Sequence, residues 1–167
     1  MPTSITVETF LPEHWEEVQI IYESGIKTGI ATFETVTPTW ENWDKGHLPF
    51  SRFVAKQQNQ IIGWTALSPV STRFIYRGVA EVSIYVAEGF KGQGIGTILL
   101  QQLIESSETN NIWTLQAGIF TENVASVKLH ESLGFRMIGY REKVGKLQDS
   151  WKDNYLLERR SKKVGIN

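Results

Sequence analysis

The chain carries near its middle the stretch Glu81-Val82-Ser83-Ile84-Tyr85-Val86-Ala87-Glu88-Gly89-Phe90-Lys91-Gly92-Gln93-Gly94-Ile95-Gly96. Its first residues alternate in the manner of a strand, and its last five place three glycines directly before a helical pattern from Thr97 to Ser107. A glycine-rich turn at the start of a helix leaves backbone N–H groups uncovered, where the helix dipole is positive. The stretch therefore predicts a site for a phosphate or pyrophosphate, and hence a phosphorylated cofactor.

Composition excludes several classes of protein. With 167 residues, we expect one domain over residues 1–167 that buries its own core. The 17 basic and 18 acidic residues give a net charge of −1 and form no basic stripe, so no nucleic-acid partner is expected. The absence of cysteine excludes disulfides, thiolate metal sites and a cysteine nucleophile. Without a signal peptide or an apolar run of about 20 residues, we expect a cytoplasmic protein without membrane contact.

Outward from this stretch, hydrophobic periodicity predicts strands and helices in an order that fixes the fold class. A helix begins at Pro12, and a second begins after Thr39, which suits an N-cap. The predicted strands are 5–9, 52–56, 60–68, 78–86, 112–120, 135–140 and 151–158, and the later helices run to about 109 and over 123–133. A long excursion is expected between residues 140 and 151. This order predicts an α/β (α+β) fold in which a mixed central sheet carries helices on both faces.

The glycines alone leave alternatives open, because glycines also serve tight turns. A dinucleotide-binding fold needs its glycine turn after an early strand, whereas three predicted strands precede the strand that leads into this turn. A Walker loop needs a lysine followed by Ser or Thr after its last glycine, whereas Thr97 follows Gly96 directly. Both rival nucleotide-binding folds are therefore disfavoured.

The strand, the Gly-x-Gly turn and the helix together resemble the GCN5-related N-acetyltransferases. The resemblance extends over residues 9–159 and is most similar to the phosphinothricin acetyltransferase branch. It rests on the blocks 81–86, Trp113-Thr114-Leu115-Gln116-Ala117-Gly118-Ile119-Phe120, Glu122-Asn123-Val124-Ala125-Ser126, Leu129-His130-Glu131-Ser132-Leu133-Gly134-Phe135 and Trp151-Lys152-Asp153. One departure is Lys91, which stands where the family motif usually has Arg or Gln.

The resemblance implies acetyl-CoA as co-substrate, bound where the strand ending near Val86 splays from the strand beginning near Trp113. It implies that backbone groups of Ile84 and Val86 hold the pantetheine arm, that a backbone N–H near Tyr85 or Val86 faces the thioester oxygen, and that Asn123 contacts the arm. It also implies a homodimer. The full set expected to bind the cofactor is Ile84, Tyr85, Val86, Lys91, Gly92, Gln93, Gly94, Ile95, Gly96, Thr97, Asn123 and Ser126.

Two side chains are candidate catalytic residues. Glu81 shares a strand face with Ser83 and Tyr85; it is either a solvent-facing charge or, as the resemblance implies, the base that deprotonates an amine. His130 lies on one helix face with Ser126, and this polar stripe is either a solvated face or part of the site. At the position of His130 many relatives have a tyrosine that protonates the CoA thiolate, and an imidazole can serve as that acid or as a base.

The resemblance also implies the acceptor, a small amino acid with a tetrahedral polar head such as phosphinothricin or methionine sulfoximine. Arg73 and Tyr76 match the family pattern for binding its anionic group, although a surface arginine beside a core tyrosine is the alternative. Other possible functions are acetylation of a polyamine or a protein N-terminus, or non-catalytic sensing of acyl-CoA. No metal site is expected, because His14 and His47 lack partners at ligand spacing. The remaining predicted walls of the acceptor pocket are Phe33, Glu34, Trp151 and Asp153.

Overall fold

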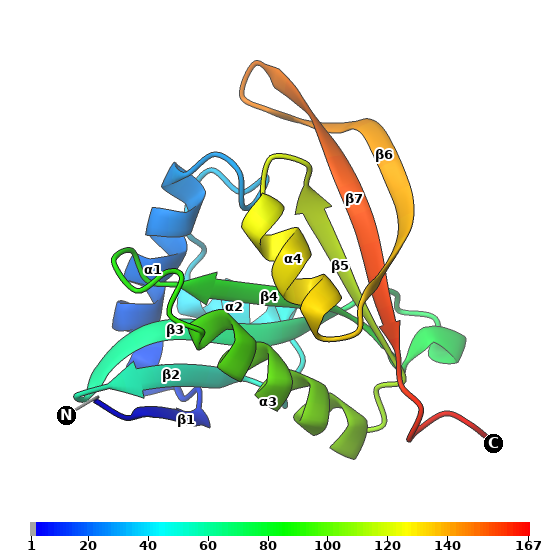
Figure 1. The fold of residues 1–167 in the computed structure, drawn as a ribbon, viewed down its shortest axis with the longest axis horizontal. Helices are drawn as coiled ribbons and strands as arrows, with labels where there is room; N and C mark the ends of the chain where they lie inside the picture. The colour runs from blue at the N-terminus through cyan, green and yellow to red at the C-terminus, as the bar shows by residue number, and fades with distance from the viewer. Residues whose placement is uncertain (1–2) are drawn as a thin grey trace.

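The computed structural model describes residues 3–167 as a seven-stranded mixed sheet with the strand order β1-β2-β3-β4-β5-β7-β6 (Figure 1). The predicted fold class is confirmed, and most predicted elements agree with the structure within two residues. The strands are β1 (Ile5–Thr9), β2 (Phe53–Gln57), β3 (Gln60–Pro69), β4 (Val79–Val86), β5 (Thr114–Phe120), β6 (Arg136–Leu147) and β7 (Ser150–Arg160). The helices are α1 (Trp15–Lys27), α2 (Trp40–Gly46), α3 (Ile95–Thr109) and α4 (Val124–Ser132), with short 3₁₀ turns η1 (Pro12–His14) and η2 (Phe74–Tyr76).

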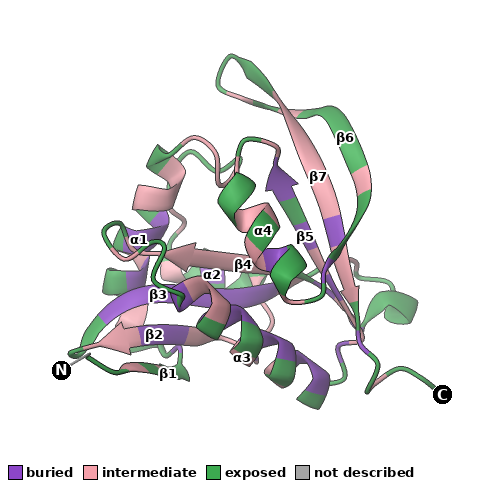
Figure 2. Cartoon of the chain, viewed as in Figure 1, coloured by how far each residue is buried: buried purple, intermediate pink, exposed green. Residues whose placement is uncertain are grey.

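Helices cover both faces of the sheet, because each face presents apolar side chains. On one face, α1 and α2 bury Val18, Ile21 and Trp43 against Trp64 of β3. On the other face, α3 buries Leu99 and its neighbours against β2, β3, β4 and β5. Figure 2 shows the buried residues concentrated on β3, β5 and the inner side of α3. The two layers hold the central strands rigidly between them.

Local sequence signals fix where the helices begin and end. The Thr39 hydroxyl accepts a hydrogen bond from the Asn42 N–H at 3.2 Å, which confirms the predicted N-cap of α2. The Asn123 side chain accepts from the Ser126 N–H at 3.3 Å and caps α4 in the same way. After α4, Gly134 adopts a left-handed φ of 91°, as the predicted cap requires.

The parallel strands β4 and β5 pair over only a short distance. Their ladder runs from Val79↔Thr114 to Glu81↔Gln116 and then stops. Beyond it, β4 stays paired with β3 as far as Val86, and β5 stays paired with β7 as far as Phe120. The two strands therefore diverge at their carboxyl ends, which confirms the expected splayed pair.

The predicted excursion between residues 140 and 151 is wrong. In the structure β6 continues to Leu147 and forms a long hairpin with β7, which projects beyond the rest of the sheet in Figure 1. The register shifts between Arg141 and Gly145, and Lys143 has a φ of 47°. This irregularity and the exposure of most of β6 hide the two-residue hydrophobic alternation by which a strand is predicted.

Candidate active site

The glycine turn forms one wall of a groove between β4, α3 and α4. Gly92 and Gly94 have φ angles of 76° and 82°, in the left-handed region that favours glycine, and Gly94 is the N-cap of α3. A groove of about 480 Å³ opens here. Eleven of the twelve residues predicted to bind the cofactor line it, namely Ile84, Tyr85, Val86, Lys91, Gly92, Gly94, Ile95, Gly96, Thr97, Asn123 and Ser126. The exception is Gln93, whose amide donates to the Gly89 carbonyl at 3.2 Å.

The groove has the chemistry needed by a long ligand with a phosphorylated end. The first N–H groups of α3 have no intrahelical partner and lie at the positive end of the helix dipole, so they suit a diphosphate. A Cβ at Gly96 would lie 3.0 Å from the Leu129 Cδ2, which shows how closely α4 approaches this turn. The Lys91 ammonium lies 3.2 Å from the Glu88 carboxylate, at the outer edge of the groove.

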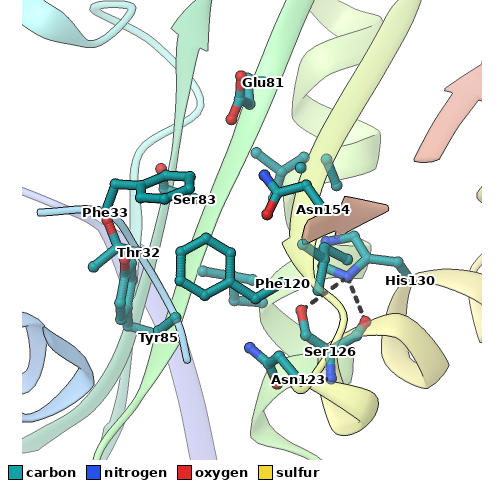
Figure 3. Close-up of a pocket in the computed structure, with 16 residues that line it drawn as sticks. Thr32, Phe33, Glu81, Ser83, Tyr85, Phe120, Asn123, Ser126, His130 and Asn154 are labelled. Atoms are coloured by element: carbon teal, nitrogen blue, oxygen red, sulfur yellow. Dashed lines mark hydrogen bonds between the residues drawn. The ribbon is translucent and has the colours of Figure 1, made fainter. Parts of the chain in front are cut away.

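A second cavity of about 240 Å³ continues from the groove into the space between the diverging strands (Figure 3). The two spaces share Ala31, Ile84, Tyr85, Asn123 and Ser126, so they form one connected site. Strands β4, β5 and β7, helix α4 and the loop before α2 contribute its walls, with Glu81, Ser83, Gly118, Phe120, Asn154, Thr32 and Phe33 among them. The groove can thus hold a cofactor whose reactive end reaches the cavity.

Glu81 lies at the mouth of this cavity and remains open to solvent. Desolvation by the surrounding protein nevertheless raises the pKa of its carboxyl, and the positive charge of Arg141 partly opposes this. Gly118 leaves the space beside Glu81 free: a Cβ on Gly118 would lie 3.9 Å from the Glu81 Oε1 and 3.6 Å from the Asn154 Nδ2. A carboxylate with a raised pKa beside open space is suited to accept a proton from a ligand.

His130 lies on the opposite side of the cavity and is only 2% exposed. Its Nδ1 lies 2.7 Å from the Ser126 carbonyl oxygen and 3.4 Å from the Ser126 hydroxyl, shown as dashed lines in Figure 3. A carbonyl oxygen only accepts, so Nδ1 carries the proton and Nε2 keeps a lone pair. Burial lowers the pKa of His130, against the opposing effect of the Ser126 carbonyl. Within residues 3–167, Nε2 is buried without a hydrogen-bond partner.

Only some of the residues predicted to bind the acceptor line the cavity. Phe33 lines the cavity, where its ring meets Phe120 edge-on at 4.6 Å between centroids. A Cβ at Gly145 would lie 2.8 Å from the Phe33 ring, so the hairpin packs on this side chain. Glu34 is exposed, and neither it, nor Tyr76 of η2, nor Arg73 directly before η2, lines the cavity of a single chain.

Trp151 and Asp153 are also absent from the described walls of the cavity. Trp151 is 57% exposed, and Asp153 accepts hydrogen bonds from the Lys143 N–H at 2.7 Å and from the Tyr140 hydroxyl. These contacts hold Asp153 on the other face of the hairpin. The neighbouring Asn154 lines the cavity instead, because side chains alternate along a strand.

Comparison with known proteins agrees with this arrangement. The family model described as acetyltransferase (GNAT) family matches residues 15–135. A phosphinothricin N-acetyltransferase from Alcaligenes faecalis is 31% identical over 163 residues, which cover 92% of this chain and 81% of that protein. The chain belongs to the acetyltransferase (GNAT) family.

Two further similarities concern this GNAT acetyltransferase. An L-methionine sulfoximine/L-methionine sulfone acetyltransferase from Pseudomonas paraeruginosa is 38% identical over 78 residues, which cover 47% of this chain and 45% of that protein. The crystal structure of a GNAT superfamily phosphinothricin acetyltransferase from Sinorhizobium meliloti, in complex with AcCoA, has a TM-score of 0.87 at 24% identity. The superposition covers 98% of this chain and 91% of that chain, and it supports the fold.

As a GNAT acetyltransferase, the protein uses acetyl-CoA, and the shape of the groove fits that co-substrate. The α3 turn suits the diphosphate, and the unpaired edge of β4 near Ile84 and Val86 suits the amide-bearing arm. Residues 3–167 contain no group of three or more acidic or histidine side chains placed to hold a metal ion. In the same described part of the chain, no helix is long and apolar enough to cross a membrane.

Sequence reasoning missed Gly118 and Asn154, which lie next to each other on β5 and β7 and both line the cavity. A signal for Asn154 was present, because it is an uncharged polar residue inside a strand that two neighbouring strands enclose. Gly118 carries the corresponding signal of a glycine within a strand, which often marks the close approach of a ligand.

Proposed function

We propose that this acetyltransferase moves the acetyl group of acetyl-CoA to the α-amino group of a small amino acid, such as phosphinothricin, methionine sulfoximine or methionine sulfone. The observation that carries the proposal is the single cavity that both Glu81 and His130 line and that joins the cofactor groove. The names of the relatives support the choice of acceptor. The small volume of the cavity also favours a small acceptor over a protein segment.

In the proposed mechanism, the cofactor is bound by the backbone of the glycine turn and by the edge of β4. Bound acetyl-CoA supplies a thioester carbonyl carbon as the electrophile. Asn123 and Ser126 border both the groove and the cavity, so they lie where the pantetheine arm would reach the reacting centre. Tyr85 is fixed by ring stacking on Trp64, with 4.9 Å between centroids, and it holds the adjacent backbone of β4 in place. This backbone would provide the N–H for the thioester oxygen.

Glu81 would act as the base. An amino acid's ammonium group carries its proton at neutral pH and lacks the lone pair needed for attack. Transfer of that proton to the Glu81 carboxylate, directly or through water, frees the lone pair of the nitrogen. The new N–C bond then forms as the C–S bond of the thioester breaks. The attacking nitrogen gives up a second proton as it becomes an amide nitrogen, and this proton passes to the departing sulfur. No cysteine is present to carry an acetyl group, so attack would be direct.

His130 would assist as a hydrogen-bond acceptor. The donor Nδ1 is already engaged by the Ser126 carbonyl, so the free lone pair of Nε2 is the group that can meet the ligand. The lowered pKa of His130 favours the neutral form of the ring. Of the two roles considered for this residue, proton acceptor therefore fits the neutral ring better than proton donor.

The roles of Arg73 and Tyr76 in binding the acceptor stay predictions, and they are coupled to the proposed homodimer. Both residues lie on the exposed turn around η2, where Phe74 and Ile75 also expose most of their apolar surface. Exposed apolar patches commonly mark protein interfaces. We also propose a cytoplasmic location, since acetyl-CoA is a cytoplasmic metabolite. Analytical ultracentrifugation of the wild type and of Phe74→Ser tests the dimer: the wild type should sediment as a dimer and the variant as a weaker one.

The activity is tested with purified protein, acetyl-CoA and an acceptor panel of phosphinothricin, methionine sulfone, spermidine and a peptide with a free N-terminus. We expect thiol release and an N-acetylated product with the two amino acids. Glu81→Gln should lose this activity while still binding acetyl-CoA, and Glu8→Gln, at the far edge of the sheet, should keep it. Acetyl-CoA binding without turnover on any amine would indicate a sensor, and turnover only with spermidine or the peptide would replace the proposed acceptor.

A further inference from the structure

The hairpin of β6 and β7 places a second pair of polar side chains on the face of the sheet that carries the cavity. Arg141 is directly opposite Asn154 in the antiparallel register of these strands. Opposed residues of an antiparallel pair point to the same face. The neighbouring pair, Tyr140 opposite Tyr155, points to the other face, where Tyr140 bonds Asp153. Because Asn154 lines the cavity, Arg141 shares the face of the cavity.

Neither side chain is held by the rest of the fold. Within residues 3–167, Arg141 makes no salt bridge or hydrogen bond, whereas Arg136 of the same strand lies 2.7 Å from the Glu158 carboxylate. Asn154 likewise makes no side-chain hydrogen bond in this part of the chain, and its Oδ1 is buried without a partner. Buried polar groups are normally paired, so the unpaired Oδ1 indicates that a ligand donor, such as the amino group of the acceptor, completes its bond. The Nδ2 of the same carboxamide is then left to donate to a carboxylate.

Asn154 lies close to Glu81 within the cavity. The Asn154 Nδ2 and the Glu81 Oε1 face the same open space above Gly118. In Figure 3 the nitrogen of the Asn154 carboxamide lies on the side of Glu81 and the oxygen on the side of Ser126. The charge of Arg141 reaches this space as well, because it lowers the pKa of Glu81 against the effect of burial.

An acceptor amino acid brings a carboxylate into a cavity that already holds the carboxylate of Glu81, so a cation is needed there. Lys152, another cation close to this part of β7, lies 3.5 Å from the Glu122 carboxylate and over the Phe120 ring. Arg141 has no such partner among the described residues. Guanidinium groups bind carboxylates through two parallel hydrogen bonds, and an amide N–H₂ can donate to the same group.

We propose that Arg141 and Asn154 form the subsite that binds the α-carboxylate of the acceptor, across Gly118 from Glu81. The subsite rests on the proposed function, because it assigns how that acceptor is recognised. It makes the enzyme selective for α-amino acids over amines that lack a carboxylate. It also leaves Arg73 and Tyr76 free to bind the polar head at the other end of the acceptor.

The test compares methionine sulfone with the amine obtained by removing its carboxyl group. The wild type should prefer the amino acid. Arg141→Gln and Asn154→Ala should each raise the KM for methionine sulfone by about 10- to 100-fold, the effect of losing a hydrogen bond to a charged group. Activity on the amine should change little, so the preference for methionine sulfone over the amine should be lost. Arg136→Gln removes the same charge from the same strand and should leave both substrates unaffected.

A second readout separates recognition from a structural role. Arg141→Gln should move the acidic limb of the kcat/KM profile for the amine to higher pH, because Glu81 loses a nearby positive charge. Binding of acetyl-CoA by calorimetry verifies that each variant is folded. An active wild type whose preference survives both substitutions, or variants that lose both substrates equally, would overturn the subsite alone. A wild type that binds acetyl-CoA but acetylates no amino acid would overturn the proposed function and the subsite with it.

Discussion

Replacing Gly118 by alanine tests whether the acceptor occupies the space between Glu81 and Asn154. The added Cβ would lie 3.6 Å from the Asn154 Nδ2 and 3.9 Å from the Glu81 Oε1, which is ordinary van der Waals contact. The fold should therefore accept the methyl group without strain. Because glycine loses more backbone entropy than alanine on folding, the free energy of unfolding should rise by about 0.4–1 kcal/mol.

The same methyl group should impair catalysis. It fills space through which the acceptor would contact both polar groups, and a displacement of about 1 Å at a reacting centre can cost about 100-fold in rate. We expect kcat/KM for methionine sulfone to fall by about 10- to 100-fold, measured by thiol release. The affinity for acetyl-CoA, measured by calorimetry, should not change, since Gly118 is absent from the described lining of the cofactor groove.

The matched control is Gly139→Ala in β6, where the new Cβ would lie 4.0 Å from the Leu156 Cβ and outside the described cavity walls. It should alter stability in the same sense and leave kcat/KM unchanged. If Gly118→Ala is stable and retains wild-type kcat/KM, the acceptor does not lie between Glu81 and Asn154. The assignment of this cavity as the acceptor site would then be refuted.

Three further predictions concern the base, the glycine turn and the buried histidine. Glu81→Gln should lower kcat by about 10²- to 10⁴-fold at every pH; wild-type turnover across the pH range would exclude Glu81 as the base. Gly94→Ala forces a left-handed φ of 82° on alanine, which costs about 1–3 kcal/mol and should weaken acetyl-CoA binding in calorimetry, whereas Gly46→Ala in α2 should not. The pKa of His130 is lowered below 6.5 in the folded chain, so its contribution to the free energy of unfolding is present above about pH 6.5 and is lost as pH falls. In denaturant unfolding, His130→Gln should reduce the fall of this free energy at acidic pH. An unchanged fall would show that the ring is not buried as described.

The sequence predicted the central part of the fold well, because buried strands and capped helices leave regular signals. The alternation before Gly89, the cap residue Thr39 and the terminating Gly134 each act locally, so each could be read from its neighbours. The extension of β6 to Leu147 could not. An exposed and irregular strand has no hydrophobic alternation to reveal it.

The site divides in the same way. Ten of the twelve positions predicted for the groove lie within the single stretch 84–97, and eleven of the twelve line it. The acceptor cavity depends on which face of β7 turns inward, and that face is set by a long-range register. A resemblance indicated Asp153, but the register places Asn154 in the cavity, and the position of Arg141 depends on the same pairing.

The short ladder between β4 and β5 has a mechanical consequence. Only three residue pairs join β4 to β5, so the half of the sheet formed by β1 to β4 is connected to the half formed by β5, β7 and β6 through a short ladder. Acetyl-CoA bound beside this ladder would contact both halves and oppose their separation. Binding of acetyl-CoA should therefore stabilise the folded chain, and a free concentration of about 100 times Kd would add about 2.7 kcal/mol to the free energy of unfolding.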